Sequence, residues 1–182
     1  MKIKTLLCVA SLSCSTVWAV EVNVIANSDF ENVDANNAAA DWKSAGKIEV
    51  AEEGVNGSKV LRSFATIKGS TNIYRGSVYQ KLPDLTPGKY ILSGEFKGDL
   101  SGLYLVVFYT SDTVAGGKFT KWISVNPSVK TNEDGWYKFS ETLEVPAGGK
   151  NGMIVIETHQ KQEKDQYTDL DNVKLIRQED KK

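Results

Sequence analysis

Two acidic residues interrupt the apolar run that closes the chain. In the stretch YTDLDNVKLIRQ, from Tyr167 to Gln178, the apolar residues predict a final β-strand, yet Asp169 and Asp171 lie inside it. Asp is a poor strand former, and a buried carboxylate without a partner is costly. Two interpretations follow. The carboxylates either bind a cation, with calcium as the expected ion, or face water on an edge strand, where charge blocks aggregation.

A second chemistry comes from aromatic residues that alternate with core residues along predicted strands. Successive side chains of a strand point to opposite faces. In KFTKWISV, a core face of Phe119, Ile123 and Val125 leaves Trp122 on the other side. Aromatic rings among hydrogen-bonding groups suit sugars, because C–H-rich ring faces stack while hydroxyls need donors and acceptors. The outward set, extended by NIYRGSVYQKL, comprises Trp122, Tyr104, Phe108, Glu95, Glu157, His159, Tyr74, Arg75 and Tyr79.

Each of these residues also has a purely structural interpretation. Alternation alone does not say which strands share a sheet, so an aromatic side chain can equally belong to the core. For Trp122 and Tyr104 the binding role and the structural role both stay open. His159, the one histidine, is expected to be an exposed strand residue without a specific role, and Asn56-Gly57-Ser58 is expected to mark a turn.

The residue pattern gives little support to an enzyme. A single histidine and the absence of a Gly-x-Ser-x-Gly elbow argue against acyl transfer, and no cluster has catalytic-zinc spacing. The remaining enzymatic alternative is a pair of carboxylates for cleaving polysaccharides, because Glu95, Glu141 and Glu157 lie in predicted strands. We therefore expect a protein without catalytic activity.

Residues 1–19 predict a secretory signal peptide. Lys2 and Lys4 precede an apolar run, and Val17 and Ala19 match the −3 and −1 positions of a cleavage site. The run is too short to span a membrane, and the rest of the chain predicts no transmembrane segment. We therefore expect a secreted or periplasmic protein.

Both cysteines lie inside this leader. The exported domain would therefore hold together through its core, or through a metal, rather than through disulfides. An alternative destination follows from SLSC, which resembles a lipobox and would make Cys14 a lipidated N-terminus.

Composition argues against nucleic acids and membrane surfaces as partners. The chain has 182 residues, of which 41% are hydrophobic and 25% charged, as in ordinary globular proteins. Its formal net charge is −1, and loss of Lys2 and Lys4 with the leader would make it about −3. Nothing indicates a nucleic-acid surface or a polybasic membrane patch. We expect a monomer.

Short β-rich runs separated by turn residues fill the remaining chain, without sustained helical periodicity. NVDANNAAADWKSAG, at 32–46, is predicted to be a loop with one short helical turn. Residues 20–177 therefore predict a single all-β domain, a sandwich or a barrel, followed by a charged tail at 178–182. The predicted strands lie near 22–26, 47–52, 58–66, 72–82, 89–97, 102–110, 118–125, 136–145, 152–160 and 168–177.

An ordered series of motifs resembles a known family. ANSDFEN, ADWKSAG, GSKVLRS, VYQKLPDLTPGKYILSGEFKG, GWYKFSETLEVP and DLDNVKL follow one another from about Asn27 to Leu175. The series looks like the jelly-roll carbohydrate-binding modules of families four, nine and twenty-two, within the galactose-binding-like superfamily. The resemblance implies an antiparallel β-sandwich that binds a polysaccharide or oligosaccharide. It also implies core positions for Trp42 and Trp136.

The resemblance implies a structural calcium between the first and last strands. Glu31 and Asp171 match the family's pattern, and carbonyls near Ser28 or Asp29 and in the GVNGS loop, around Gly57, would complete a shell of six to eight oxygens. Such modules usually accompany a catalytic domain, and no such domain is present in this chain. A scaffold or protein-interaction module without a glycan ligand is therefore the alternative.

Overall fold

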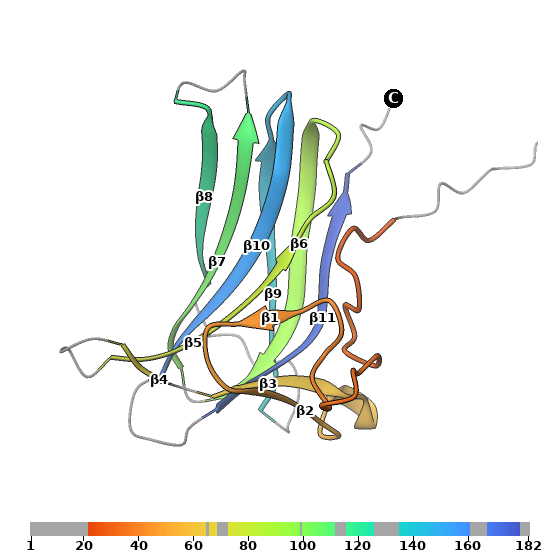
Figure 1. Ribbon diagram of the computed structural model, residues 1–182, viewed down its shortest axis with the longest axis vertical. Coiled ribbons are helices and arrows are strands. Elements are labelled where there is room, and N and C mark those ends of the chain that lie inside the picture. Colours follow the sequence, from red (N-terminus) through yellow and green to blue (C-terminus); the bar gives the residue numbers. More distant parts are fainter. Residues whose placement is uncertain are drawn as a thin grey trace, which may run out of the picture.

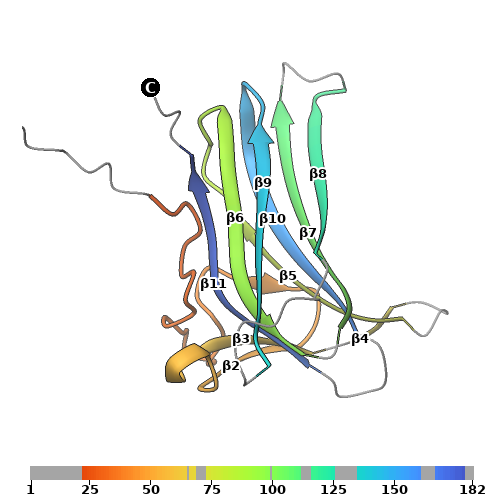
Figure 2. The same ribbon diagram turned by 180° about the vertical axis from the view of Figure 1, so that it is seen from behind.

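The protein is a sandwich of two antiparallel β-sheets. The computed structural model describes residues 22–64, 66–68, 73–98, 100–111, 116–125, 135–160 and 167–178. The predicted leader, with Cys14, lies outside these residues. Within them the only helical element is a single 3-10 turn, η1 (Val55–Gly57), and nothing helical is long and apolar enough to cross a membrane. The predicted all-β sandwich is confirmed, and Figures 1 and 2 show its two layers from opposite sides.

Most strands that follow one another in sequence lie in different sheets, and the exceptions are the paired neighbours β2 and β3, β4 and β5, and β7 and β8. The five-stranded sheet has the order β2-β3-β11-β6-β9, and the six-stranded sheet has the order β1-β5-β10-β7-β8 with β4 paired to β5. The five-stranded sheet consists of β2 (Ile48–Ala51), β3 (Val60–Phe64), β6 (Gly88–Lys97), β9 (Tyr137–Val145) and β11 (Tyr167–Arg177). The six-stranded sheet consists of β1 (Lys43–Ser44), β4 (Thr66–Lys68), β5 (Ile73–Lys81), β7 (Leu100–Ser111), β8 (Lys118–Val125) and β10 (Gly149–Gln160).

The hydrophobic core lies between the sheets and follows the alternation of the strands. Inward residues such as Leu92, Leu105, Ile156 and Leu170 have no solvent exposure. Burial of each such side chain contributes roughly 1.5–3 kcal/mol to folding. Trp42 and Trp136 are also buried, so the expectation that they are core residues is confirmed.

Three local predictions were wrong. Residues 22–26 do not form a strand but make one isolated bridge, Asn23 to Ile176. The predicted strand 58–66 divides into β3 and β4, which belong to different sheets. The segment 32–46 has no helical turn; it contains the bridge Val33 to Ala39 and the short strand β1, which alternation over two residues does not reveal.

The N-terminal segment runs alongside β11 (Figures 1 and 2). Val24 donates its N–H to the carbonyl of Leu175 at 3.0 Å, and Val173 donates to the carbonyl of Ser28 at 2.9 Å. The side-chain oxygen of Asn23 accepts the N–H of Leu175 at 2.9 Å. The two ends of the described chain are thus joined by hydrogen bonds.

A buried ion pair joins β11 to β3. Arg62 donates from Nε to Asp169 Oδ1 at 2.8 Å and from Nη2 to Asp169 Oδ2 at 2.9 Å. Its guanidinium carbon lies 3.8 Å from the ring centroid of Tyr167, and Nη2 also contacts Glu53 at 2.9 Å. The hydrogen bond to Asp169 raises the pKa of Arg62, so the guanidinium stays charged. This network satisfies one of the two acids of the closing strand.

We expect Asp169→Ala to lower the free energy of unfolding by about 3–5 kcal/mol, because it leaves the Arg62 guanidinium buried without its partner. Glu53→Gln, at a mostly exposed side chain, should cost less than about 1 kcal/mol. The double replacement Arg62→Met with Asp169→Leu should recover most of the loss. Urea unfolding of the variants measures all three, and equal effects of Asp169→Ala and Glu53→Gln would contradict a buried, coupled pair.

Candidate functional site

The second acid of the closing strand contacts the loop that contains η1. Asp171 has no solvent exposure, and its Oδ2 accepts hydrogen bonds from Ser58 Oγ at 2.8 Å and from the N–H of Val55 at 3.3 Å. Its Oδ1 accepts the N–H of Asn172 at 2.7 Å. Burial raises the pKa of Asp171 and outweighs these hydrogen bonds, which lower it. The interpretation that Asp169 and Asp171 face water on an edge strand is wrong, because both are buried and β11 is central.

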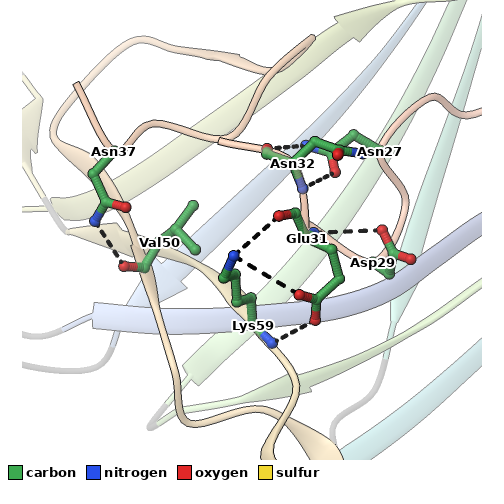
Figure 3. A network of polar contacts seen from close by, with 7 residues as sticks. All are labelled: Asn27, Asp29, Glu31, Asn32, Asn37, Val50 and Lys59. Carbon is green, nitrogen blue, oxygen red and sulfur yellow. Dashed lines mark hydrogen bonds and ion pairs between the residues drawn. The ribbon is translucent and has the colours of Figure 1, made fainter. Parts of the chain in front are cut away.

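Glu31 reaches the same loop from the N-terminal segment. Its Oε1 accepts the N–H of Lys59 at 2.9 Å, and the ammonium of Lys59 lies 3.1 Å from the Glu31 carbonyl and 3.9 Å from Oε2 (Figure 3). Ser58 and Lys59 are consecutive, so the carboxylates of Asp171 and Glu31 converge on one short stretch of backbone. Asp29 accepts the N–H of Glu31 at 3.4 Å.

These donors are of the kind that calcium prefers, since they are carboxylates beside backbone carbonyls. Two carboxylates are available, and the described residues contain no cluster of three or more His, Cys, Asp or Glu side chains that could hold a metal. A calcium ion would therefore take its remaining ligands from carbonyls. Of the predicted carbonyl ligands, Ser28 accepts a hydrogen bond from Val173, and Gly57 stands in the turn of η1 with a φ of +78°.

Asn172, which follows Asp171, lies at an irregularity in the pairing of β11. Its φ is +51°, a left-handed value that Asn tolerates better than β-branched residues do. The register with β6 shifts between Asp171 and Lys174, as in a β-bulge. Its side chain donates to Glu95 Oε2 at 3.1 Å.

The structure does not bring Glu95 to the aromatic residues with which it was grouped. Glu95 lies on β6 in the five-stranded sheet, is only 8% exposed, and contacts the ammonium of Lys138 at 3.1 Å. Its place beside Asp171 in the register makes it part of the buried polar cluster, so its inclusion in an outward aromatic set is corrected.

The outer face of the six-stranded sheet carries two parallel rows of residues. Residues aligned by the pairing of β5, β10, β7 and β8 form one row of Tyr79, Val155, Val106 and Trp122, called here the apolar row. The next row, two residues along each strand, consists of Ser77, Glu157, Tyr104 and Ser124, called here the polar row.

The neighbouring positions along these strands are the core residues, which fixes the orientation of the rows. Val78, Ile156, Leu105 and Ile123 are all buried. Trp122, by contrast, is 60% exposed, which is the alternation predicted for β8. With strands about 4.8 Å apart, the apolar row extends about 14 Å from Tyr79 to Trp122. A row of aromatic and aliphatic groups beside a row of hydroxyls and a carboxylate offers stacking and hydrogen bonding side by side.

Four predicted binding residues have described backbones in this sheet but side chains outside the described part. The backbone of Phe108 pairs with Thr120 and Met153, and that of His159 pairs with Arg75. Tyr74 pairs with Gln160. Their roles stay predictions.

Sequence reasoning missed the roles of Arg62 and Ser58, and it missed Ser77 of the polar row, whereas alternation places Ser124 on the same side of its strand as Trp122. For Arg62 a signal existed, because a charged residue inside the apolar run VLRSF needs a buried partner, and two unexplained acids stood elsewhere in the chain. The serines carry no such signal, since their importance arises only from the strand pairing.

Comparisons with known proteins support this architecture. No protein-family profile matches the chain, and no curated protein does. Among solved structures, a galactotriose-bound module, TmCBM61, has a TM-score of 0.52 and 15% identity over 86% of this chain and 99% of its own. A xylan-binding module, CBM22-1 of Paenibacillus barcinonensis Xyn10C, has a TM-score of 0.54 and 14% identity over 82% of this chain and 90% of its own. The fold is a jelly roll of the carbohydrate-binding-module type.

The same jelly roll also occurs inside larger enzymes. The enzymatically active domain of tailspike protein 4 from bacteriophage CBA120 has a TM-score of 0.56 and 15% identity over 84% of this chain. This chain spans only 21% of that protein's length. Likeness at such identities establishes the fold, and the carbohydrate-binding-module resemblance found in the sequence is confirmed at that level.

Burial of Asp171 sets the sign of a pH effect in metal-free protein. Because its pKa is raised above the ordinary value of 3.8, the folded state binds a proton here before the unfolded state does. The contribution of Asp171 to the free energy of unfolding should therefore increase as pH falls through the pKa of the folded state toward 3.8. In EDTA, urea unfolding of wild type and Asp171→Asn should show wild type gaining free energy of unfolding relative to the variant as pH falls from 7 toward 3.8. A relative loss would mean that ionised Asp171 stabilises the fold.

Proposed function

We propose that this chain is an exported, non-catalytic carbohydrate-binding protein that holds a polysaccharide or oligosaccharide on the outer face of its six-stranded sheet. The observation that carries the proposal is the apolar row with exposed Trp122 at its end, directly beside the polar row. Sugar rings stack on aromatic faces while their hydroxyls need hydrogen-bonding partners, and these two rows supply both.

The solved structures with the same fold support a binding role. Two of the modules that match this chain over nearly their whole length are named for galactotriose and xylan ligands. Within the strand bounds of the six-stranded sheet, Glu157 is the one acidic residue. Retaining and inverting hydrolysis both need two carboxyl groups, about 5–10 Å apart, and one acid does not provide them. The proposed role is therefore binding rather than cleavage.

Export is supported by the leader pattern at 1–19. The lipidated alternative at Cys14 would place the same domain on a membrane surface. Either destination leaves the outer face available to a polymer.

We also propose a structural calcium ion, held by Asp171 and Glu31 at the loop between η1 and β3. The supporting observation is that burial makes the Asp171 carboxylate unfavourable in its charged form, which a cation would relieve. The two carboxylates contact consecutive residues of one loop, Ser58 and Lys59. Such an ion would add to the hydrogen bonds that join the chain ends and would take no part in glycan contacts.

Trp122→Ala should weaken binding to a retained glycan by about 2 kcal/mol, or roughly 30-fold in Kd, since it removes an exposed stacking surface. Trp122→Phe should keep part of the affinity. The control is Tyr167→Ala, which removes an exposed aromatic side chain from the other sheet and should leave glycan affinity unchanged. Affinity electrophoresis on soluble polysaccharides, with melting temperatures as a check on folding, makes the comparison. If no glycan retains the protein, glycan binding is contradicted, and the protein-interaction alternative takes its place.

Removal of calcium should lower the melting temperature by several degrees, because an ion present at about 100 times its Kd contributes about 2.7 kcal/mol. Scanning calorimetry with and without EDTA measures this for wild type and Asp171→Asn. The variant should melt lower and show no further change with EDTA. Identical wild-type melting temperatures in the two buffers would contradict the calcium ion. The hydrogen bonds of Asp171 with Ser58 and Val55 would then be what joins β11 to the loop.

A further inference from the structure

The strands of the two sheets differ sharply in charge. The five-stranded sheet is balanced, with six basic residues, Arg62, Lys89, Lys97, Lys138, Lys174 and Arg177, and six acidic residues, Glu49, Glu95, Glu141, Glu144, Asp169 and Asp171. The six-stranded sheet has one acidic residue, Glu157, and seven basic ones, Lys43, Lys68, Arg75, Lys81, Lys118, Lys121 and Lys150. The chain as a whole has a net charge of −1, so this positive excess is local.

Among the described residues, few cations of either sheet form an ion pair, so the difference between the sheets lies in their acids. On the five-stranded sheet, Arg62 and Lys138 pair with Asp169 and Glu95, and the other bases have acidic residues on the same strands to offset their charge. On the six-stranded sheet, the exposed ammonium groups of Lys43, Lys81, Lys118 and Lys150 form no ion pair with any other described residue. Their charge is therefore not cancelled by a described carboxylate.

These lysines border the apolar row. Lys43 pairs with Tyr79 and so extends the row at one end. Lys81 is opposite Met153, in the row next to the apolar row. This row and the polar row with Glu157 lie on opposite sides of the apolar row. Lys118 and Lys150 share a further row through Thr110. Strands about 4.8 Å apart and rows about 6.8 Å apart place Lys43 and Lys81 within about one Debye length, 8 Å, of the apolar row.

We propose that the outer face of the six-stranded sheet recognises an anionic polysaccharide, whose rings lie on the apolar row and whose carboxylate or sulfate groups face the lysines. This inference rests on the proposed function and adds the charge of the ligand to it. Potentials that are complementary in sign favour encounter and suppress wrong partners. A nucleic acid is the less suitable polyanion, because the sequence pI is about 5.9 whereas nucleic-acid domains commonly exceed 9.

The test compares polymers that share a backbone and differ in charge. Carboxymethylcellulose is paired with hydroxyethylcellulose, polygalacturonate with its methyl ester, and dextran sulfate with dextran, which separates carboxylate from sulfate recognition. Affinities are measured by affinity electrophoresis at 20 mM and 500 mM NaCl, with single-stranded DNA as a further polyanion. We expect at least one charged polymer to bind about tenfold more tightly than its neutral partner at low salt, with the ratio falling at high salt.

Lysine variants locate the effect. Lys43→Gln with Lys81→Gln should remove most of the preference for the charged polymer. Lys89→Gln with Lys174→Gln, which removes two exposed charges from the other sheet, should leave the preference intact and serves as the matched control. Trp122→Ala should weaken binding of the charged polymer as well, because recognition uses the apolar row.

The outcomes separate this inference from the proposed function. Equal binding within every pair would overturn the anionic ligand and leave glycan binding standing. Binding to no polysaccharide would overturn both. Equal affinity for single-stranded DNA, or full retention of a charged polymer by Trp122→Ala, would show general attraction of polyanions and overturn recognition of an anionic glycan.

Discussion

The architecture depends on keeping two carboxylates inside the central strand of a sheet. Asp169 and Asp171 occupy β11 between β3 and β6, where neither reaches water. Each must therefore find its partners within the protein, since an uncompensated buried charge would cost several kcal/mol. Asp169 takes Arg62 from β3, and Asp171 takes Ser58 and the backbone of the loop before β3. Both solutions hold the N-terminal third of the chain against its last strand.

That requirement explains the motifs at the two ends of the chain. Asn27 donates to the carbonyls of Asn32 and Ala40 and accepts the N–H of Asn32, which shapes the loop that presents Glu31 (Figure 3). Phe30 is fully buried against Trp42, with ring centroids 5.4 Å apart. At the other end, Asn172 supplies the left-handed residue of the bulge after Asp171. The motif residues thus serve the junction of the chain ends, which is why they indicate the fold more strongly than the ligand.

The two sheets have different electrostatic roles. In the five-stranded sheet, acids and bases are equal in number, and the ion pairs Arg62–Asp169 and Lys138–Glu95 join neighbouring strands of the sandwich. In the six-stranded sheet, bases exceed acids seven to one within the strand bounds, and Lys43, Lys81, Lys118 and Lys150 share the register of its outer face with aromatic and hydroxyl groups. A surface of this kind is poorly suited to stabilising its own fold, because like charges repel and exposed aromatic area remains in contact with water. It is better suited to a ligand that brings negative charge and flat apolar surface together.

Local patterns in the sequence determined the class of the fold, most strand positions and the direction in which single residues face. Alternation is a local property, so it correctly separated exposed Trp122 from buried Ile123 and Val125. Which strands lie side by side is decided by contacts between residues far apart in the chain, and alternation carries no such information. Only the tertiary structure therefore placed Glu95 beside Asp171 rather than beside Trp122, and aligned Tyr79 with Trp122 across four strands. The pairing of Arg62 with Asp169 likewise arises between positions 107 residues apart, where burial makes the partner obligatory but only the folded chain selects it.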